Sequence, residues 1–247
     1  MINDDEILER LCKKEEVECQ TARKLKAKIF PLLEEAHMKL GYRFDKAFFE
    51  QRKGMEIRLA NSKTILLLLR RLKPQFFSIN ERTIISLHLE YLMVVEGLFT
   101  SEINFLIFTL IANGHDLYST QKGKYVKTLS DIEEVNLGFK LKFLREHEFD
   151  TLIANKVDIK LRNSVAHLFY EINENGTIII RKRKIAKKDY ERLYVDLRNI
   201  SYSLHLINLV YYRRFAAVKA FGLTLKKLGN AKNLKHNQKN CSNCENT

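Results

Sequence analysis

The sequence predicts a mainly α-helical protein. Only 2 prolines and 9 glycines interrupt its 247 residues, and Leu, Ile, Lys and Glu are abundant, which favours long helices over a β architecture with many turns. Apolar residues recur at spacings of three and four along several stretches, as on the buried face of a helix. With 45% hydrophobic residues the chain can bury a sizeable core, so we exclude a disordered protein.

Residues 1–75 are predicted to form an additional N-terminal helical extension. A highly charged helix covers about Asp4 to Leu40, and Pro31 should kink or divide it. Gly54 separates two further helices. Pro74 ends the last of these, and we place the main domain boundary there. A helix with a thin apolar stripe usually packs against the fold or binds a partner.

The main helical domain is predicted to cover residues 76–225. A capping-box pattern beginning at Ser78 opens it, and the most apolar part of the chain follows, from Arg82 to about Asn113, with a break near Gly97. This part is not a membrane span, because a spanning helix needs about twenty largely apolar residues. Polar side chains recur too often here: Glu90, Glu96, Glu102 and Asn104. A helix pair buried in a bundle is the better interpretation.

A polar loop is expected from His115 to Lys127, and a second capping box, Ser130 to Glu133, opens the next helix. A further helix runs from about Asp150 to Tyr170. Two short apolar runs then flank Asn175-Gly176, a dipeptide typical of a two-residue β-hairpin turn.

The last long helix is predicted from about Lys187 to Phe221, where apolar residues form one long seam. Residues 226–247 are rich in Asn, Lys and Gly, so we expect a mobile basic tail.

The charge distribution points to a polyanionic partner. A formal net charge of +13 attracts nucleic acid, although many basic proteins owe such a balance to a solvated surface. The segment after the hairpin is the densest cluster and could hold an RNA backbone, or be a basic exposed strand end. Its basic residues are Arg181, Lys182, Arg183, Lys184, Lys187 and Lys188.

The cysteines favour an intracellular protein with reduced thiols. All four lie near the polar ends of the chain: Cys12, Cys19, Cys241 and Cys244. This distribution argues against a disulfide framework. Cys241 and Cys244 have the spacing of half a zinc site, but no second pair accompanies them, so we predict no metal and no cofactor. The N-terminus is acidic and no apolar signal region follows it, so a cytoplasmic location without membrane association is expected.

The stretch Leu161-Arg162-Asn163-Ser164-Val165-Ala166-His167 carries the chemistry of the chain. At about 100 degrees per residue, Leu161 and Leu168 fall on the face toward the core, together with Val157 and Val165. A second apolar face collects Ile159, Ala166 and Tyr170, and we expect a two-fold copy of the helix to cover it. Arg162 lies about 140 degrees from His167 on such a helix. The two side chains therefore converge more readily across a dimer than within one chain.

Arg162 and Asn163, followed by His167, resemble the Arg-polar-spacer-His signature of the HEPN superfamily of nucleotide-binding domains. The resemblance covers about residues 76–222. It implies a HEPN-like helical bundle and a metal-independent endoribonuclease, in which the motifs of two chains form one cleft. Such proteins include toxins of toxin–antitoxin pairs and antiviral defence effectors, so a cognate antitoxin or regulatory protein is a further expected partner.

The residue types fit RNA cleavage by attack of a 2′-hydroxyl on the adjacent phosphorus. Histidine has an ordinary pKa of about 6.5 and can accept or donate a proton near neutrality. Arginine offers a planar, permanently charged fork to phosphate, and Asn163 can orient His167 or donate to a phosphate. Two alternatives stay open. One is a non-catalytic module that dimerises and binds RNA, and the other is a helical regulatory protein whose N-terminal helix binds a partner.

Overall fold

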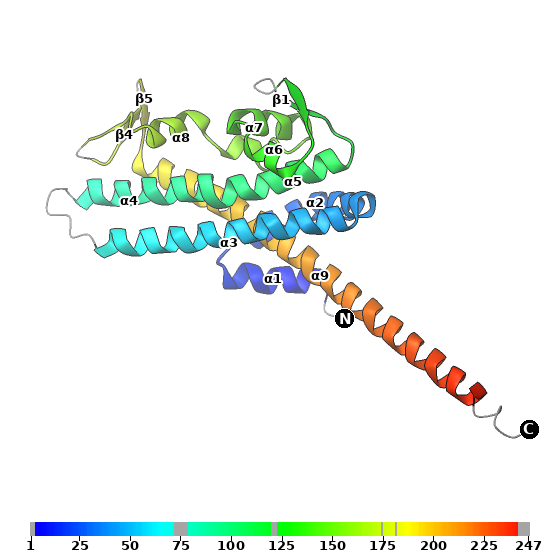
Figure 1. The fold of residues 1–247 in the computed structure, drawn as a ribbon. Coiled ribbons are helices and arrows are strands. Elements are labelled where there is room, and N and C mark those ends of the chain that lie inside the picture. The colour runs from blue at the N-terminus through cyan, green and yellow to red at the C-terminus, as the bar shows by residue number, and fades with distance from the viewer. Residues whose placement is uncertain (1–2, 72–78, 120–122, 174, 181, 242–247) are drawn as a thin grey trace, which may run out of the picture.

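The computed structural model describes residues 3–71, 79–119, 123–173, 175–180 and 182–241, and its architecture is mainly α, as predicted (Figure 1). The helices are α1 (Asp4–Lys14), α2 (Cys19–Leu40), α3 (Tyr42–Arg71), α4 (Ile79–Met93), α5 (Thr100–Ala112), α6 (Leu129–Glu133), α7 (Leu137–Glu146), α8 (Ile159–Ala166) and α9 (Lys187–Cys241), with a π-helical turn η1 (Val94–Phe99) and a 3-10 turn η2 (Ala154–Lys156). Two small antiparallel sheets complete the fold: β1 (Leu117–Ser119) with β2 (Lys124–Val126), and β3 (Glu171–Ile172), β4 (Ile178–Ile180) and β5 (Arg183–Ile185) in that order.

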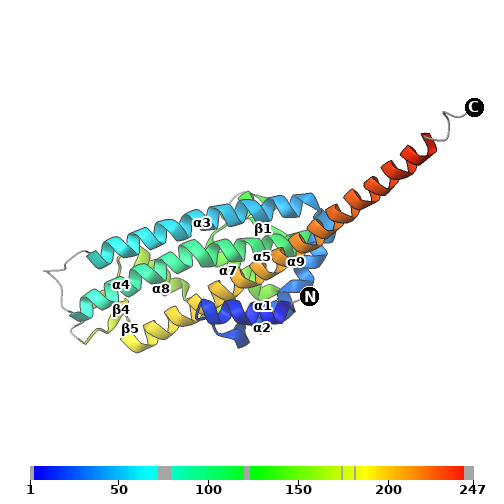
Figure 2. The same ribbon diagram turned by 90° about the horizontal axis from the view of Figure 1, so that it is seen from below.

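The rod formed by α4, η1 and α5 is the centre of the bundle. On one side of it lie α6, α7 and α8 with both sheets, and α3 lies on another (Figure 1). Helix α9 crosses η1 and α2 and then runs out of the bundle toward the C-terminus (Figure 2). The stretch Ile84–Ala112 is long and apolar enough to cross a membrane, since an 18-residue window within it has a mean hydropathy of 1.6. However, 72% of that window is buried inside the bundle. Such burial is typical of a core helix.

Helices α1 and α2 share one hydrophobic core with α5 and α9. Phe44 at the start of α3 contacts the rings of Phe105 in α5 and Tyr211 in α9, with ring centroids 5.3 and 6.5 Å apart. The predicted boundary at Pro74 lies outside the described residues and stays a prediction. The helices before it nevertheless pack against those that follow it.

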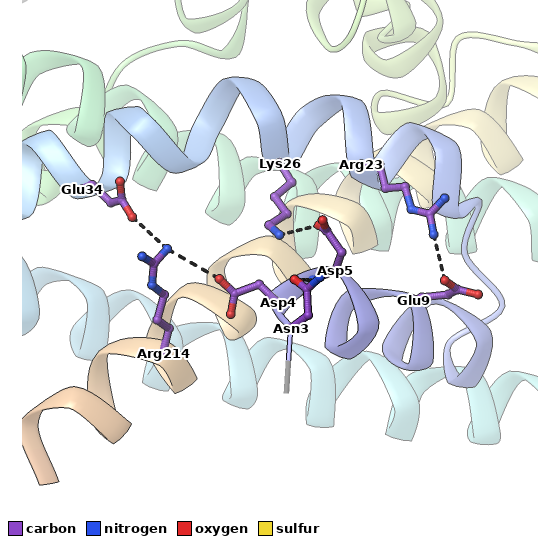
Figure 3. Close-up of polar contacts among 8 residues, drawn as sticks. All are labelled: Asn3, Asp4, Asp5, Glu9, Arg23, Lys26, Glu34 and Arg214. Carbon is purple, nitrogen blue, oxygen red and sulfur yellow. Dashed lines mark hydrogen bonds and ion pairs between the residues drawn. The ribbon is translucent and has the colours of Figure 1, made fainter. Parts of the chain in front are cut away.

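Ion pairs at the rim fasten α1 to its neighbours (Figure 3). From α2, Lys26 lies 2.5 Å from Asp5 and Arg23 lies 2.8 Å from Glu9. Arg214 of α9 lies between Asp4 and Glu34, at 3.5 and 2.9 Å. Exposed pairs of this kind contribute about 0–1 kcal/mol each, so the apolar core holds α1 in place and the charges fix its register.

A buried carboxylate fixes the register of α9 on α5. Glu102 is 1% exposed. It accepts a hydrogen bond of 2.6 Å from Asn208 Nδ2, and its other oxygen lies 3.1 Å from His205 Nδ1. Because breaking such a buried group from its partners costs several kcal/mol, sliding α9 by one turn is disfavoured.

The N-terminal helix is divided, but not at Pro31, where a division or a kink was predicted; a kink there stays a prediction. The break falls at residues 15–18, where Glu16 adopts a positive φ of 54°, whereas Pro31 lies inside α2. Phe30 and Leu33 on either side of the proline are buried in the core, so packing outweighs the backbone hydrogen bond that proline removes. Gly54 likewise lies inside a continuous α3, because a helix tolerates a glycine at a cost of about 1 kcal/mol.

Other predicted boundaries need correction. The stretch predicted as a loop holds the β1–β2 hairpin, whose Leu117 and Val126 are buried. The capping box before α6 is formed by Thr128 and Asp131 rather than by Ser130 and Glu133. The first predicted box begins at Ser78, which lies outside the described residues.

Two further predictions concern the last third of the chain. The hairpin around Asn175-Gly176 is confirmed as β3 and β4, and β5 extends it to three strands. The predicted two-residue turn is too short, because the last backbone pairing joins the Asn173 N–H to the Thr177 carbonyl at 3.1 Å. Helix α9 begins at Lys187 as predicted but continues past Phe221 to Cys241. The predicted helix end is therefore too early, and the mobility of residues 226–247 stays a prediction.

Candidate active site

Helix α8 is shorter than the predicted Asp150–Tyr170 helix. It begins after Asp158, whose side chain accepts a hydrogen bond of 2.9 Å from the Leu161 backbone N–H, the arrangement of an N-cap. Leu161 and Val165 are buried and attach α8 to the bundle, as predicted. The helix ends at Ala166, and the His167 N–H donates to the Asn163 carbonyl at 3.0 Å.

The shorter helix changes the expected second apolar face. Leu168, predicted to face the core, has a positive φ of 57° and is 75% exposed. Ile159 and Tyr170 are partly buried against the core of their own chain, and Ala166 is exposed. A helix that stops at residue 166 cannot carry residue 170, so the predicted continuous face is wrong. Dimerisation itself stays a prediction.

A cavity of about 570 Å³ opens beside the motif. One wall is α8, with Asn163, Ser164 and His167 among the residues that line it. The cavity is also lined by Lys182, which precedes β5, and by Arg183 at the start of β5. Strands β4 and β5 lie beside α8 in Figure 1. Lys160 and the 71% exposed Phe169 also line it, together with Leu161 and Ile180. The cavity therefore unites the predicted histidine and asparagine with part of the predicted nucleic-acid cluster.

Arg162 faces a different surface and does not line this cavity. Its Nε donates to the Glu96 carboxylate at 2.5 Å, and its Nη1 donates to Asn163 Oδ1 at 2.8 Å. Asn163 thus links Arg162 to the cavity, and its amide nitrogen keeps two donors for a ligand. The structure brings Asn163 and His167 together within one chain and places Arg162 with Glu96.

A buried lysine interacts electrostatically with Glu96. Lys140 in α7 is 2% exposed, and its Nζ donates to the Glu133 carbonyl at 3.4 Å. Burial lowers the pKa of Lys140 to about 8, although the carboxylates of Glu133 and Glu96 partly oppose that shift. Glu96 therefore lies in the field of two cations, Arg162 and Lys140.

The segment after the motif rests on a buried histidine. The rings of Tyr170 and Tyr190 both lie edge-on to that of His88, with centroids 4.3 and 5.0 Å from it. His88 is 2% exposed, and neither ring nitrogen has a hydrogen-bond partner among the described residues. Burial lowers the pKa of His88 to about 4 and raises the pKa of Tyr190. The imidazole is therefore neutral at pH 7.

The rest of the predicted nucleic-acid cluster divides between two places. Lys184 lines a second cavity beside β5. At the start of α9, Lys187 lies 4.0 Å from Glu191 and Lys188 is exposed. Arg181 lies outside the described residues. The cluster thus covers one edge of the sheet and the first turn of α9.

No group of three or more His, Cys, Asp or Glu side chains able to hold a metal ion occurs among the described residues. Cys241 is the last residue of α9, and Cys244, the other half of the predicted pair, lies outside the described part of the chain.

Three residues of the site were not predicted. Lys160 stands two positions before Arg162 and Phe169 two positions after His167, so proximity to the motif was an available signal for both. Glu96 is 66 positions from Arg162 in sequence, and only its charge within an apolar stretch marked it. Sequence reasoning used that charge to exclude a membrane span and assigned it no further role.

Comparison of the chain with protein-family models, with curated proteins and with solved structures finds no match.

Proposed function

We propose that this chain is a metal-independent endoribonuclease of the HEPN type with a HEPN-like helical bundle, acting as a homodimer. The observation that carries the proposal is the cavity that Asn163 and His167 line together with Lys182 and Arg183. An imidazole close to cationic side chains provides proton transfer and phosphate binding in one place. Among the described residues, none hydrogen-bonds the His167 side chain, so the ring is available to a substrate.

The reaction requires two proton transfers. The 2′-hydroxyl loses its proton and attacks the adjacent phosphorus, the bond from phosphorus to the 5′-oxygen breaks, and that oxygen gains a proton. The products are a 2′,3′-cyclic phosphate and a 5′-hydroxyl. His167 transfers a proton, and Lys160, Lys182 and Arg183 stabilise the charge on the phosphoryl oxygens. One chain supplies a single motif histidine, so a second copy would provide the other.

The exposed residues at the end of the motif support a two-fold partner. Leu168 and Phe169 are 75% and 71% exposed, and Phe169 lines the cavity. In the proposed interface they replace Ile159 and Tyr170 as the apolar contacts, beside Ala166. Arg162 lies outside the cavity of its own chain, so its guanidinium reaches the phosphate bound by the other protomer. In that complex the RNA phosphate replaces Glu96 as the anion that Arg162 binds.

A cytoplasmic toxin or antiviral defence effector, controlled by an antitoxin or regulatory protein, is the cellular role that this activity would serve. A second candidate is RNA binding without cleavage. The Arg162–Glu96 pair favours it, because an arginine that never leaves Glu96 cannot stabilise a transition state.

The test is incubation of the purified protein with RNA in excess EDTA. We expect fragments with cyclic-phosphate ends, and a loss of at least about a hundredfold in rate for His167→Ala, since general acid–base catalysis contributes about 10² to 10⁴. Arg162→Ala should show a similar loss while sedimenting as the same dimer with an unchanged circular dichroism spectrum. Undiminished cleavage by either variant, or a strictly monomeric wild-type protein, would contradict the composite site. Binding without any cleavage would establish the second candidate instead.

A further inference from the structure

A second cavity adjoins the first and shares Arg183 with it. It has a volume of about 460 Å³ and lies between η2, β5 and the first turns of α9. Its cationic side chains are Lys156, Arg183, Lys184 and Arg192. Because Arg183 lines both cavities, its side chain lies where the two cavities meet.

The balance of charge among the lining residues changes from one cavity to the next. The first cavity is lined by cations and by no carboxylate of the described residues. In the second cavity Asp189 and Asp196 offset some of the positive charge, and the cations still outnumber them. A third cavity of about 180 Å³ continues past Lys156 and Asp196, but there Glu18 and Asp196 balance Lys24 and Lys156. The excess of positive charge therefore extends from the first cavity, beside His167, through the second cavity and ends at Lys156.

The side chains of the second cavity are arranged to bind an anion. Arg183 Nη1 donates to the Asp158 carboxylate, which also caps α8. This hydrogen bond holds the guanidinium where the two cavities meet, and its other N–H groups can donate to a phosphate. Lys156 Nζ lies 3.6 Å from Asp196 Oδ2, and both side chains are partly exposed. No carboxylate in the described part of the chain pairs with Lys184 or Arg192.

We propose that the second cavity binds the phosphate backbone of the RNA strand whose scissile phosphate lies in the first. The inference rests on the proposed function and extends the substrate from a single phosphodiester to a strand that runs past Arg183 to Arg192 and Lys156. Backbone contacts of this kind carry no base preference. They strengthen binding, and this contribution falls as the salt concentration rises. For single strands, a plot of the logarithm of the association constant against the logarithm of the salt concentration has a slope of about −0.7 per phosphate contact.

The experiment measures RNA binding in the His167→Ala background, in which the RNA stays intact. Fluorescence anisotropy of a labelled, unpaired oligonucleotide gives the Kd over a series of salt concentrations. The double variant Lys156→Gln/Arg192→Gln is compared with Arg43→Gln/Lys46→Gln, an equal charge change at exposed positions of α3. We expect the first variant to bind roughly tenfold more weakly and its salt slope to fall by about 1.4, the value for two phosphate contacts. Arg192→Lys alone should keep most of the wild-type salt slope, because it retains the positive charge.

A parallel measurement of cleavage, with His167 intact, separates the two proposals. Lys156→Gln/Arg192→Gln should raise KM for a long RNA and leave kcat nearly unchanged, because neither side chain lines the cavity that holds the reacting bond. If RNA is bound and cut but this variant matches the α3 control in Kd and salt slope, the second cavity is not on the RNA path and the proposed function stands. If the wild-type protein neither binds nor cuts RNA, both proposals fail.

Discussion

Replacing His88 by leucine should remove an acid sensitivity that is built into the core. The folded state holds His88 neutral, with a pKa of about 4 against the ordinary 6.5, because burial of the ring penalises its charged form. Among the described residues no hydrogen-bond partner of the ring offsets that penalty. As the pH falls below 6.5 the unfolded chain takes up a proton that the folded chain refuses until about pH 4. Stability is therefore present above pH 6.5 and is lost as the pH falls toward 4.

The size of the effect follows from the two pKa values. Each unit of difference corresponds to about 1.4 kcal/mol, so the full loss is about 3 kcal/mol below pH 4, and about 2 kcal/mol has been lost at pH 5. Leucine has a similar volume and no titratable group. It gives up the ring contacts with Tyr170 and Tyr190 but also removes two unpaired buried nitrogens, so the variant should be about as stable as wild type at pH 8.

Urea unfolding of both proteins at pH 8, 6 and 5, at one protomer concentration, provides the measurement. The difference in the free energy of unfolding between wild type and His88→Leu should grow by about 2 kcal/mol from pH 8 to pH 5. Other titrating groups are common to both proteins and cancel in that difference. Parallel curves for the two proteins would refute the reasoning, because they would mean that the buried ring is protonated as easily as in water.

Two further pairs of variants test the local structure by the same unfolding assay. Gly54→Ala should stabilise the chain by about 0.5–1 kcal/mol, because the added Cβ meets only Arg58 Nη2 at an ordinary 3.6 Å. Gly41→Ala should destabilise it, because Gly41 has a φ of 51°, which alanine rarely adopts. Equal effects of the two variants would mean that backbone conformation does not decide the outcome. Asp158→Ala should cost about 1–2 kcal/mol by removing the cap of α8, whereas Asp158→Asn keeps a capping oxygen and should cost less. A full loss with asparagine would assign the effect to the Arg183 ion pair instead.

Patterns that depend on neighbours in the sequence predicted the fold well. The apolar spacing of Leu161 and Val165 gave the buried face of α8, and Asn175-Gly176 gave the hairpin. The end of α8 was missed because no glycine or proline follows Ala166, and the turn there uses Leu168 at a positive φ, a conformation that leucine rarely adopts. Propensity alone had no means of identifying that turn.

Contacts between distant segments account for the rest of the differences. Tyr170 was assigned to an outer face, but the ring of His88 in α4 covers it, and a helical wheel contains no information about α4. Arg162 was expected to meet the His167 of a second chain, yet in this structure it binds Glu96 of its own chain. The chemistry of the motif was readable from residue types, while the direction of each side chain depended on partners that the sequence does not place.

The π-helical turn η1 allows the central rod to hold one additional residue without changing which faces of α4 and α5 meet the core. An α-helix advances about 100 degrees per residue, and a π turn arises where an additional residue is accommodated in the helix. Deleting one residue other than Glu96 from Val94–Phe99 would convert this turn to ordinary α geometry and leave the faces of α4 and α5 nearly in place. The same deletion within α4 or α5 would instead rotate one end of the rod by about 100 degrees relative to the other, so that either Glu96 would lose Arg162 or the apolar side of α5 would leave the core. A single-residue deletion should therefore be tolerated better in η1 than in the helices on either side of it.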